Sequence, residues 1–112
     1  MNHTEVPISV TFRHLDSTDA IREHLDKKLL HVLKHVPAVT DVHVILGAEK
    51  HHQRKTCEIV VHASHTQLTV HDEEQDLYTA IDRATAKLDA QASKLKGRVV
   101  NESRRSSARK AG

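Results

Sequence analysis

Apolar and polar side chains alternate along four segments of the chain. An alternation with a period of two puts the apolar side chains on one face, which is typical of a strand with one buried side. In the first segment, Ile8, Val10 and Phe12 would share the buried face. The four segments are residues 6–12, 41–46, 56–63 and 67–71. The pattern therefore predicts four half-buried strands.

A longer segment after the first strand repeats its apolar residues every three or four positions, as an amphipathic helix does. Ser17, Thr18 and Asp19 are candidate N-caps, and Pro37 would end this helix close to Val36. The apolar stripe consists of Ile21, Leu25, Leu29, Val32 and Val36. We expect one face of this helix to cover the apolar side of the sheet.

A second helix is predicted over about residues 75–96, with Gly97 as its C-cap. Four acidic residues would lie at the positive N-terminal end of this helix: Asp72, Glu73, Glu74 and Asp76. Its apolar stripe consists of Leu77, Ile81, Ala84, Leu88, Ala92 and Leu95. Residues 99–112 are small, polar and basic, and we expect them to form a disordered tail.

The elements follow the order β-α-β-β-β-α. This order predicts an α+β fold, a two-layer sandwich in which two helices cover one face of a four-stranded sheet. The helix between the first two strands favours a parallel pair, and the short later connections favour antiparallel pairs. Residues 1–98 would form one α/β domain, and residues 99–112 a separate basic tail.

The composition narrows the range of functions. Phe12 and Tyr78 are the only aromatic residues, too few for a sheet that stacks several bases. For Tyr78, packing against the first helix or the sheet edge and stacking on a base are both open. The single cysteine, Cys57, is expected to be a buried strand residue, which fits an intracellular compartment. Neither a membrane-spanning run nor a signal peptide is visible in the sequence.

The sequence contains no pattern typical of an enzyme or of a cofactor site. Glycine occurs only at Gly47, Gly97 and Gly112, so the chain lacks a glycine-rich phosphate loop. His31 and His35 are spaced to clasp a metal from one helix face, but the sequence suggests no third ligand. We therefore expect no catalytic activity, no cofactor, no metal, no small-molecule substrate and no membrane.

Charge is distributed unevenly along the chain. From Arg83 onward there are nine Lys/Arg and two acidic residues, whereas the part before it has eight Lys/Arg and thirteen acidic residues. On the first helix a stripe beside the apolar one contains His24, Lys28, His31 and His35; on the second the corresponding stripe contains Arg83, Lys87, Lys94 and Arg98. A solvated helix usually mixes signs at i,i+4, so the segregation indicates a partner surface, a cationic groove or ridge whose natural ligand is a phosphate backbone. Folded RNA fits best, and duplex DNA or an acidic protein would also fit.

The start of the second helix resembles a known family. The run from Asp76 to Asp82, followed by Lys87-Leu88, Gln91 and the basic residues 94–98, is similar to the D-x-Y-x-A-I-D…K-L…Q…K signature of the ribosome hibernation promoting factor / ribosome-associated inhibitor family. The first helix, with its Asp-Ala-Ile-Arg-Glu start at residues 19–23, also resembles that family. The resemblance covers about residues 6–98.

The resemblance implies a cytoplasmic protein that binds the small ribosomal subunit. Its partner would be the rRNA of the mRNA/tRNA channel near the decoding centre, and it would repress translation in stationary phase or stress. Long members carry a second, dimerisation domain, which we expect this chain to lack. The RNA-binding residues implied are Arg22, Lys28, His31, Arg83, Lys87, Lys94, Lys96 and Arg98. Because His31 stands where other members often place lysine, its contact would strengthen on protonation.

The alternative is a basic protein-interaction module that binds an acidic regulatory partner. Salt distinguishes the two hypotheses, because each phosphate contact contributes about −0.7 to −0.9 to the log–log slope of affinity against salt. A mainly apolar protein interface would not show this dependence.

Overall fold

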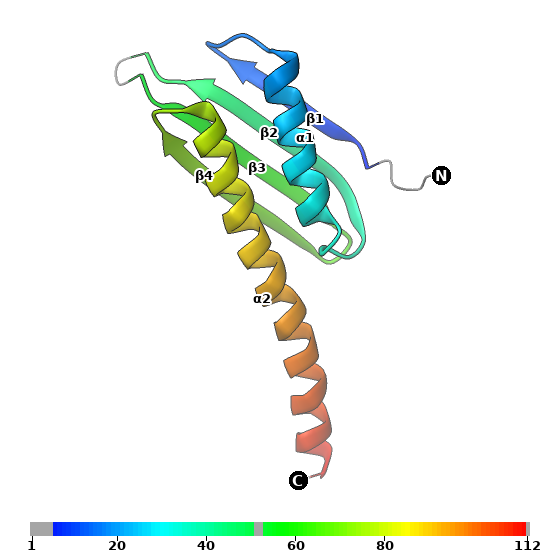
Figure 1. Cartoon of the computed structure of the whole chain (residues 1–112). Coiled ribbons are helices and arrows are strands. Elements are labelled where there is room, and N and C mark those ends of the chain that lie inside the picture. The colour runs from blue at the N-terminus through cyan, green and yellow to red at the C-terminus, as the bar shows by residue number, and fades with distance from the viewer. Residues whose placement is uncertain (1–5, 51–52, 112) are drawn as a thin grey trace.

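The computed structural model describes residues 6–50 and 53–111, with side chains described as far as residue 95. The predicted order of elements is confirmed (Figure 1). The elements are β1 (Ile8–Arg13), α1 (Asp19–Leu33), β2 (Val39–Ala48), β3 (Lys55–Ala63), β4 (Thr66–Glu74) and α2 (Leu77–Ala111). No helix in the described part of the chain is long and apolar enough to cross a membrane.

The four strands form one sheet in the order β1-β2-β3-β4. β1 pairs with β2 in parallel, while β2/β3 and β3/β4 are antiparallel, as the connection lengths predicted. One irregularity interrupts this sheet. Val39 pairs with Ala63 and Asp41 pairs with His62, so Thr40 is an extra residue in a β-bulge.

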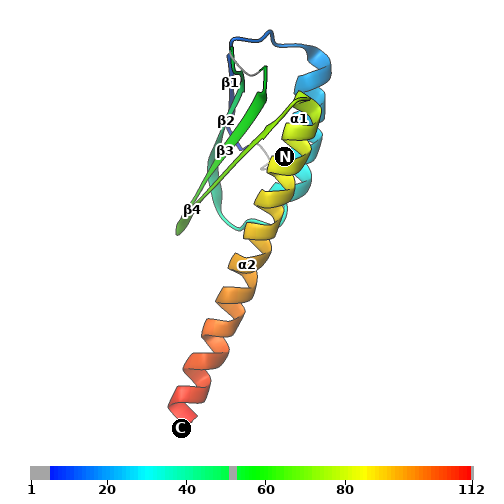
Figure 2. The same ribbon diagram turned by 90° about the vertical axis from the view of Figure 1, so that its left-hand side faces the viewer.

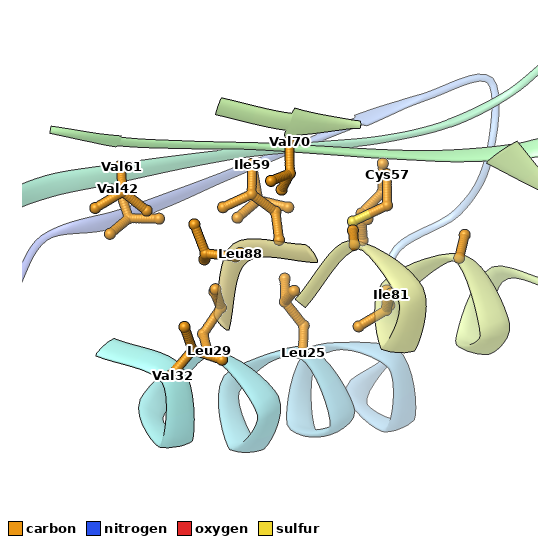
Figure 3. Packing of buried hydrophobic residues seen from close by; sticks show 14 of the residues in the cluster. Leu25, Leu29, Val32, Val42, Cys57, Ile59, Val61, Val70, Ile81 and Leu88 are labelled. Carbon is orange, nitrogen blue, oxygen red and sulfur yellow. The ribbon is translucent and has the colours of Figure 1, made fainter. Parts of the chain in front are cut away.

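Both helices cover the same face of the sheet, and the opposite face has no helix on it (Figure 2). Side chains from the two helices and from the sheet point toward one another in a single core (Figure 3). The largest fully buried ones are Leu25, Leu29, Leu46, Ile59, Ile81 and Leu88. The predicted α+β two-layer sandwich is thereby confirmed. Both predicted apolar stripes are buried at its centre except for Leu95, which is half-buried.

The end of α1 differs slightly from the prediction. The helix stops at Leu33, and residues 34–36 continue as a turn in which the amides of His35 and Val36 donate to the carbonyls of Val32 and Leu33. Pro37 disfavours the helical conformation for the residue before it, which explains the earlier end. Val36 still belongs to the core, because the turn keeps its side chain buried.

The second helix is longer than the sequence predicted. α2 continues through Gly97 to Ala111 and extends past the sheet (Figure 1). The expected end at Gly97 and the irregular backbone expected from residue 99 are therefore corrected. One glycine inside a helix costs only about 1 kcal/mol relative to alanine, and the Ala, Arg, Lys and Glu residues that follow favour the helix. The division into a domain at residues 1–98 and a tail at 99–112 stays a prediction.

The start of α2 also requires a correction. Asp72, Glu73 and Glu74 belong to β4 rather than to the helix N-terminus. Of the four acidic residues, Asp76 caps the helix, since its carboxylate accepts from the Thr79 amide at 3.0 Å and from the Thr79 hydroxyl at 3.1 Å. This reassignment places Asp72 among residues that face the helices.

Candidate nucleic-acid interface

The first polar stripe lies along the side of α1 that faces α2. Thr18 starts the helix by accepting the Ile21 amide at 3.2 Å, and this start fixes which residues face the core. Because Leu25 and Leu29 are buried in the core, the polar stripe next to them lies beside α2. There its side chains contact a carboxylate of α2. Asp82 Oδ1 lies 2.6 Å from His24 Nε2 and 3.5 Å from Lys28 Nζ.

A second contact of the same kind occurs nearer the end of α1. His35 Nδ1 lies 3.3 Å from Asp89 Oδ1. His31 is exposed, and its ring meets that of His35 edge-on at 5.6 Å between centroids. A shallow groove between the two helices is lined by Lys28, His31, Val32, Asp82, Thr85, Ala86 and Asp89. Two cationic or titratable groups of α1 therefore share this groove with two carboxylates of α2.

The second polar stripe lies on the other flank of α2, along β4. The side chain of Arg83 contacts two carboxylates, Asp72 at 3.2 Å and Glu74 at 2.9 Å. Lys87 Nζ donates to the carbonyl of His71 at 2.9 Å and lies 3.6 Å from Asp72. Further along, the Gln91 amide donates to the carbonyl of Thr69 at 3.2 Å. The stripe is thus attached to the edge strand of the sheet.

Of the predicted groove or ridge, the two basic stripes do not form the opposite walls of one groove. The stripe of α1 faces the Asp82 and Asp89 side of α2, whereas Arg83 and Lys87 lie on the β4 side. The two stripes therefore do not face each other, and a line of carboxylates lies between them. Both remain accessible from the solvent side of the helical layer, as exposed fractions of 44% for Lys28, 60% for Arg83 and 50% for Lys87 indicate.

Asp72 is a functional candidate that the sequence analysis missed. Its side chain is only 9% exposed, and it accepts from the Glu73 amide at 2.8 Å while it contacts Arg83 and Lys87. A buried carboxylate is stable only when it is paired. The signal was present in the alternation, because Leu68, Val70 and Asp72 occupy the helix-facing positions of β4 and the third is charged.

The remaining candidate residues have different positions. Arg22 is exposed, and its separation of six residues from Lys28 puts it on another flank of α1. Lys94 is exposed and borders a depression that Thr66, Gln67 and Gln91 also line. Lys96 and Arg98 lie in α2 beyond the part whose side chains are described. The structure thus gathers Arg83, Lys87 and Lys94 along one flank and keeps Arg22 apart from them.

Tyr78 packs against α1. Its ring meets the His24 ring edge-on at 5.0 Å between centroids. This contact agrees with the packing role suggested for Tyr78. The side chain nevertheless stays 38% exposed.

Cys57 is buried in β3, as predicted. Burial and, to a smaller extent, the charge of Asp72 raise the pKa of the thiol from 9.0 to about 12. Asp72 is directly opposite Cys57 on β4, which explains its influence. A thiol with so high a pKa is a poor nucleophile and a poor metal ligand at neutral pH.

The histidine pair of α1 is not part of a larger ligand group in the described part of the chain. Three potential ligands do converge elsewhere, on the helix-free face of the sheet. They are Asp41, His43 and His62, whose ligand atoms lie within 4.8 Å of one another.

Comparison with known proteins connects this arrangement to a family. The model of the Sigma 54 modulation protein / S30EA ribosomal protein family matches residues 8–100. A ribosome hibernation promoting factor from Azotobacter vinelandii is 32% identical over 93 residues, which cover 83% of this chain and 85% of that protein. The ribosome hibernation promoting factor of Escherichia coli (strain K12) is 27% identical, with coverage of 82% and 95%.

Two solved structures share the fold. The Thermus thermophilus Protein Y N-terminal domain aligns with a TM-score of 0.70 at 29% identity and covers 80% of this chain and 99% of that domain. A ribosomal subunit interface protein from Coxiella burnetii aligns with a TM-score of 0.71 at 25% identity, with coverage of 82% and 99%. The family suggested by the signature at the start of the second helix is confirmed, and the chain belongs to the Sigma 54 modulation protein / S30EA ribosomal protein family.

Proposed function

We propose that this protein is a ribosome hibernation factor that binds the small ribosomal subunit. Its helical layer would contact rRNA in the mRNA/tRNA channel near the decoding centre. Occupation of that channel would repress translation in the cytoplasm during stationary phase or stress. The protein would act by binding alone, without catalysing a reaction.

The family and the relatives support the ribosomal part of this proposal. The relatives are named ribosome hibernation promoting factors, and one structural neighbour is named a ribosomal subunit interface protein. The matched residues 8–100 include the whole sheet, α1 and α2 as far as residue 100, so the similarity is not confined to one motif.

The proposal that rRNA is the ligand rests on the arrangement of side chains on the flank of α2 beside β4. Arg83 and Lys87 are both well exposed, yet both are held at their inner side by the buried Asp72. Such anchoring restricts the side chains before RNA arrives, so less conformational entropy is lost on binding. The outer N–H groups of both side chains remain available for phosphate oxygens.

The remaining cations would extend this contact. Lys94 lies further along the same flank, and Lys96 and Arg98 follow it in the sequence. Lys28 and His31 would contact RNA from the α1 side of the layer, and Arg22 from the flank of α1 away from them. Contacts of this kind give affinity and positioning rather than sequence readout, which suits recognition of folded rRNA by shape.

Sedimentation with isolated ribosomal subunits tests the proposal. The full chain would be mixed with small or large subunits at low and at high salt, and the pelleted protein measured. We expect salt-sensitive binding to the small subunit alone, close to one molecule per subunit. Absence of binding to either subunit, or equal binding to both, would contradict the proposal.

The same experiment separates rRNA binding from the alternative of an acidic protein partner. Binding through several phosphates weakens steeply with salt, at about −0.7 to −0.9 per contact in the log–log slope. A slope close to zero, together with binding that survives nuclease treatment of the subunits, would favour the protein-interaction module.

A further inference from the structure

The helix-free face of the sheet carries a cluster of three metal-ligating side chains. Asp41 and His43 are two residues apart on β2 and therefore point to the same face. His62 stands directly opposite Asp41 on β3. His43 Nε2 lies 3.1 Å from Asp41 Oδ2, and the His43 and His62 rings meet at 6.0 Å between centroids. All three ligand atoms fall within 4.8 Å of one another.

An irregularity of the backbone beside this cluster supports the assignment of a site. The β-bulge at Thr40 lies directly before Asp41 and interrupts the pairing of β2 with β3. Bulges commonly re-aim a neighbouring side chain. The Thr40 hydroxyl lies 3.2 Å from Asp41 Oδ1 and 3.1 Å from the carbonyl of His62, and it can donate to either. When the hydroxyl donates to Oδ1, it holds that oxygen of the carboxylate, while Oδ2 is directed to His43.

We propose that Asp41, His43 and His62 form a binding site for a divalent transition-metal ion, with Zn²⁺ as the natural occupant. Two imidazoles and one carboxylate are a donor set that Zn²⁺ accepts, and a tetrahedral ion would complete its shell with water. In such a shell two ligand atoms lie about 3.3 Å apart, given metal–ligand distances of about 2.0–2.1 Å. The ligand atoms of Asp41 and His43 are already 3.1 Å apart, which is close to this spacing. To bring the third ligand atom to the ion therefore requires mainly a rotation of the His62 side chain.

The surroundings are compatible with entry of an ion. His43 is 54% exposed and Asp41 37% exposed, so solvent reaches the ligand atoms. Thr40 acts as the outer hydrogen-bond partner that metal-bound carboxylates usually have. The site is on the opposite side of the sheet from Arg83 and Lys87, and its occupation does not depend on the proposed ribosomal contact.

Calorimetric titration of the full chain with ZnCl₂ tests the site without any ribosome. We expect one site per chain in the unchanged protein. His62→Ala removes a ligand and should weaken Zn²⁺ binding at least about tenfold, since even loss of an outer hydrogen-bond partner costs 10–100-fold. Asp41→Asn preserves the size of the side chain and should weaken binding similarly, which guards against an effect of misfolding. Circular dichroism would check that both variants fold.

His71→Ala is the matched control. His71 is exposed on β4 and belongs to the same sheet face, but it is four residues along the strand from Gln67, the neighbour of His62. This control should bind Zn²⁺ as the unchanged protein does. In imidazole ¹⁵N NMR spectra, one equivalent of Zn²⁺ should shift the resonances of His43 and His62 and leave that of His71 in place. Equal affinities for all variants, or shifts spread over all histidines, would overturn the proposal.

Discussion

His24 of α1 and Asp82 of α2 are joined across the helical layer by a 2.6 Å contact. The same carboxylate lies 3.5 Å from Lys28, a residue implied in RNA binding. A negative charge therefore lies inside the surface proposed to meet a polyanion. It helps to hold the two helices together, and it opposes the approach of phosphate.

Asp82→Asn should therefore strengthen binding to the small subunit. Two unit charges 4 Å apart in water interact by about 1 kcal/mol, so loss of the carboxylate should lower the Kd about two- to fivefold. Stability should fall by less than about 1 kcal/mol, because the pairs with His24 and Lys28 are partly exposed. Sedimentation at fixed salt measures the Kd. Asp16→Asn, at an exposed position before α1, serves as the control, and equal tightening there would contradict the prediction.

Arg83→Gln with Lys87→Gln should weaken small-subunit binding about a hundredfold, as each charge-assisted contact is worth about 1.5 kcal/mol. The salt slope should fall by about 1.5, the share of two phosphate contacts. Glutamine is preferable to glutamate here, because a new carboxylate beside Asp72 and Glu74 would disturb the fold as well.

The control for this pair is Arg13→Gln with Lys50→Gln. It changes the net charge equally, and both residues are exposed outside the helical layer. We expect its Kd and salt slope to stay close to those of the unchanged protein. Equal losses in both double variants would mean that net charge alone governs binding.

The order of elements, the strand pairing and the shared face of the helices followed from periodicity and connection length. These features depend on which side chains must be buried, and that information is local. The end of α2 could not be predicted from these patterns, because a single glycine can end a helix or be tolerated inside one. Gly97 lies inside α2. Propensity differences of about 1 kcal/mol are too small to decide a boundary.

The electrostatics of the candidate site was harder to predict for a different reason. Asp82 was visible as the last residue of the run that resembles the family signature, but only the rotation of α2 relative to α1 brings it to His24. Asp72 was visible as a charge in an apolar position, yet its partners Arg83 and Lys87 follow it by 11 and 15 residues. Such relationships depend on tertiary packing, which a one-dimensional pattern does not contain.

Asp72→Asn should lower the free energy of unfolding by about 1–2 kcal/mol, because a buried group loses its charged partners. The asparagine oxygen can still accept a hydrogen bond from the Glu73 amide. The decrease in the free energy of unfolding therefore measures the contribution of the contacts with Arg83 and Lys87. Urea denaturation measures the change. Glu74→Gln removes a shorter contact with Arg83 from a more exposed position and should cost less than about 0.5 kcal/mol. A larger loss for Glu74→Gln would show that burial of Asp72 is not the deciding factor.

Cys57 should make stability fall at alkaline pH. Its pKa is raised from 9.0 to about 12 in the folded protein, chiefly by burial. Below pH 9 the thiol is protonated in both states, and its contribution is fully present. Between pH 9 and 12 the unfolded chain loses a proton that the folded chain keeps, so the free energy of unfolding falls by up to about 1.4 kcal/mol per pH unit.

Urea unfolding at pH 7.5 and pH 10 would measure this loss, with Cys57→Val as the control. Valine suits a buried strand position and does not titrate. The relevant quantity is the difference between the two proteins, because every titratable group other than Cys57 is common to both. We expect the unchanged protein to lose about 1 kcal/mol more than Cys57→Val on going to pH 10. Equal losses would mean that the thiol is less shielded in the folded state than its buried position in β3 implies.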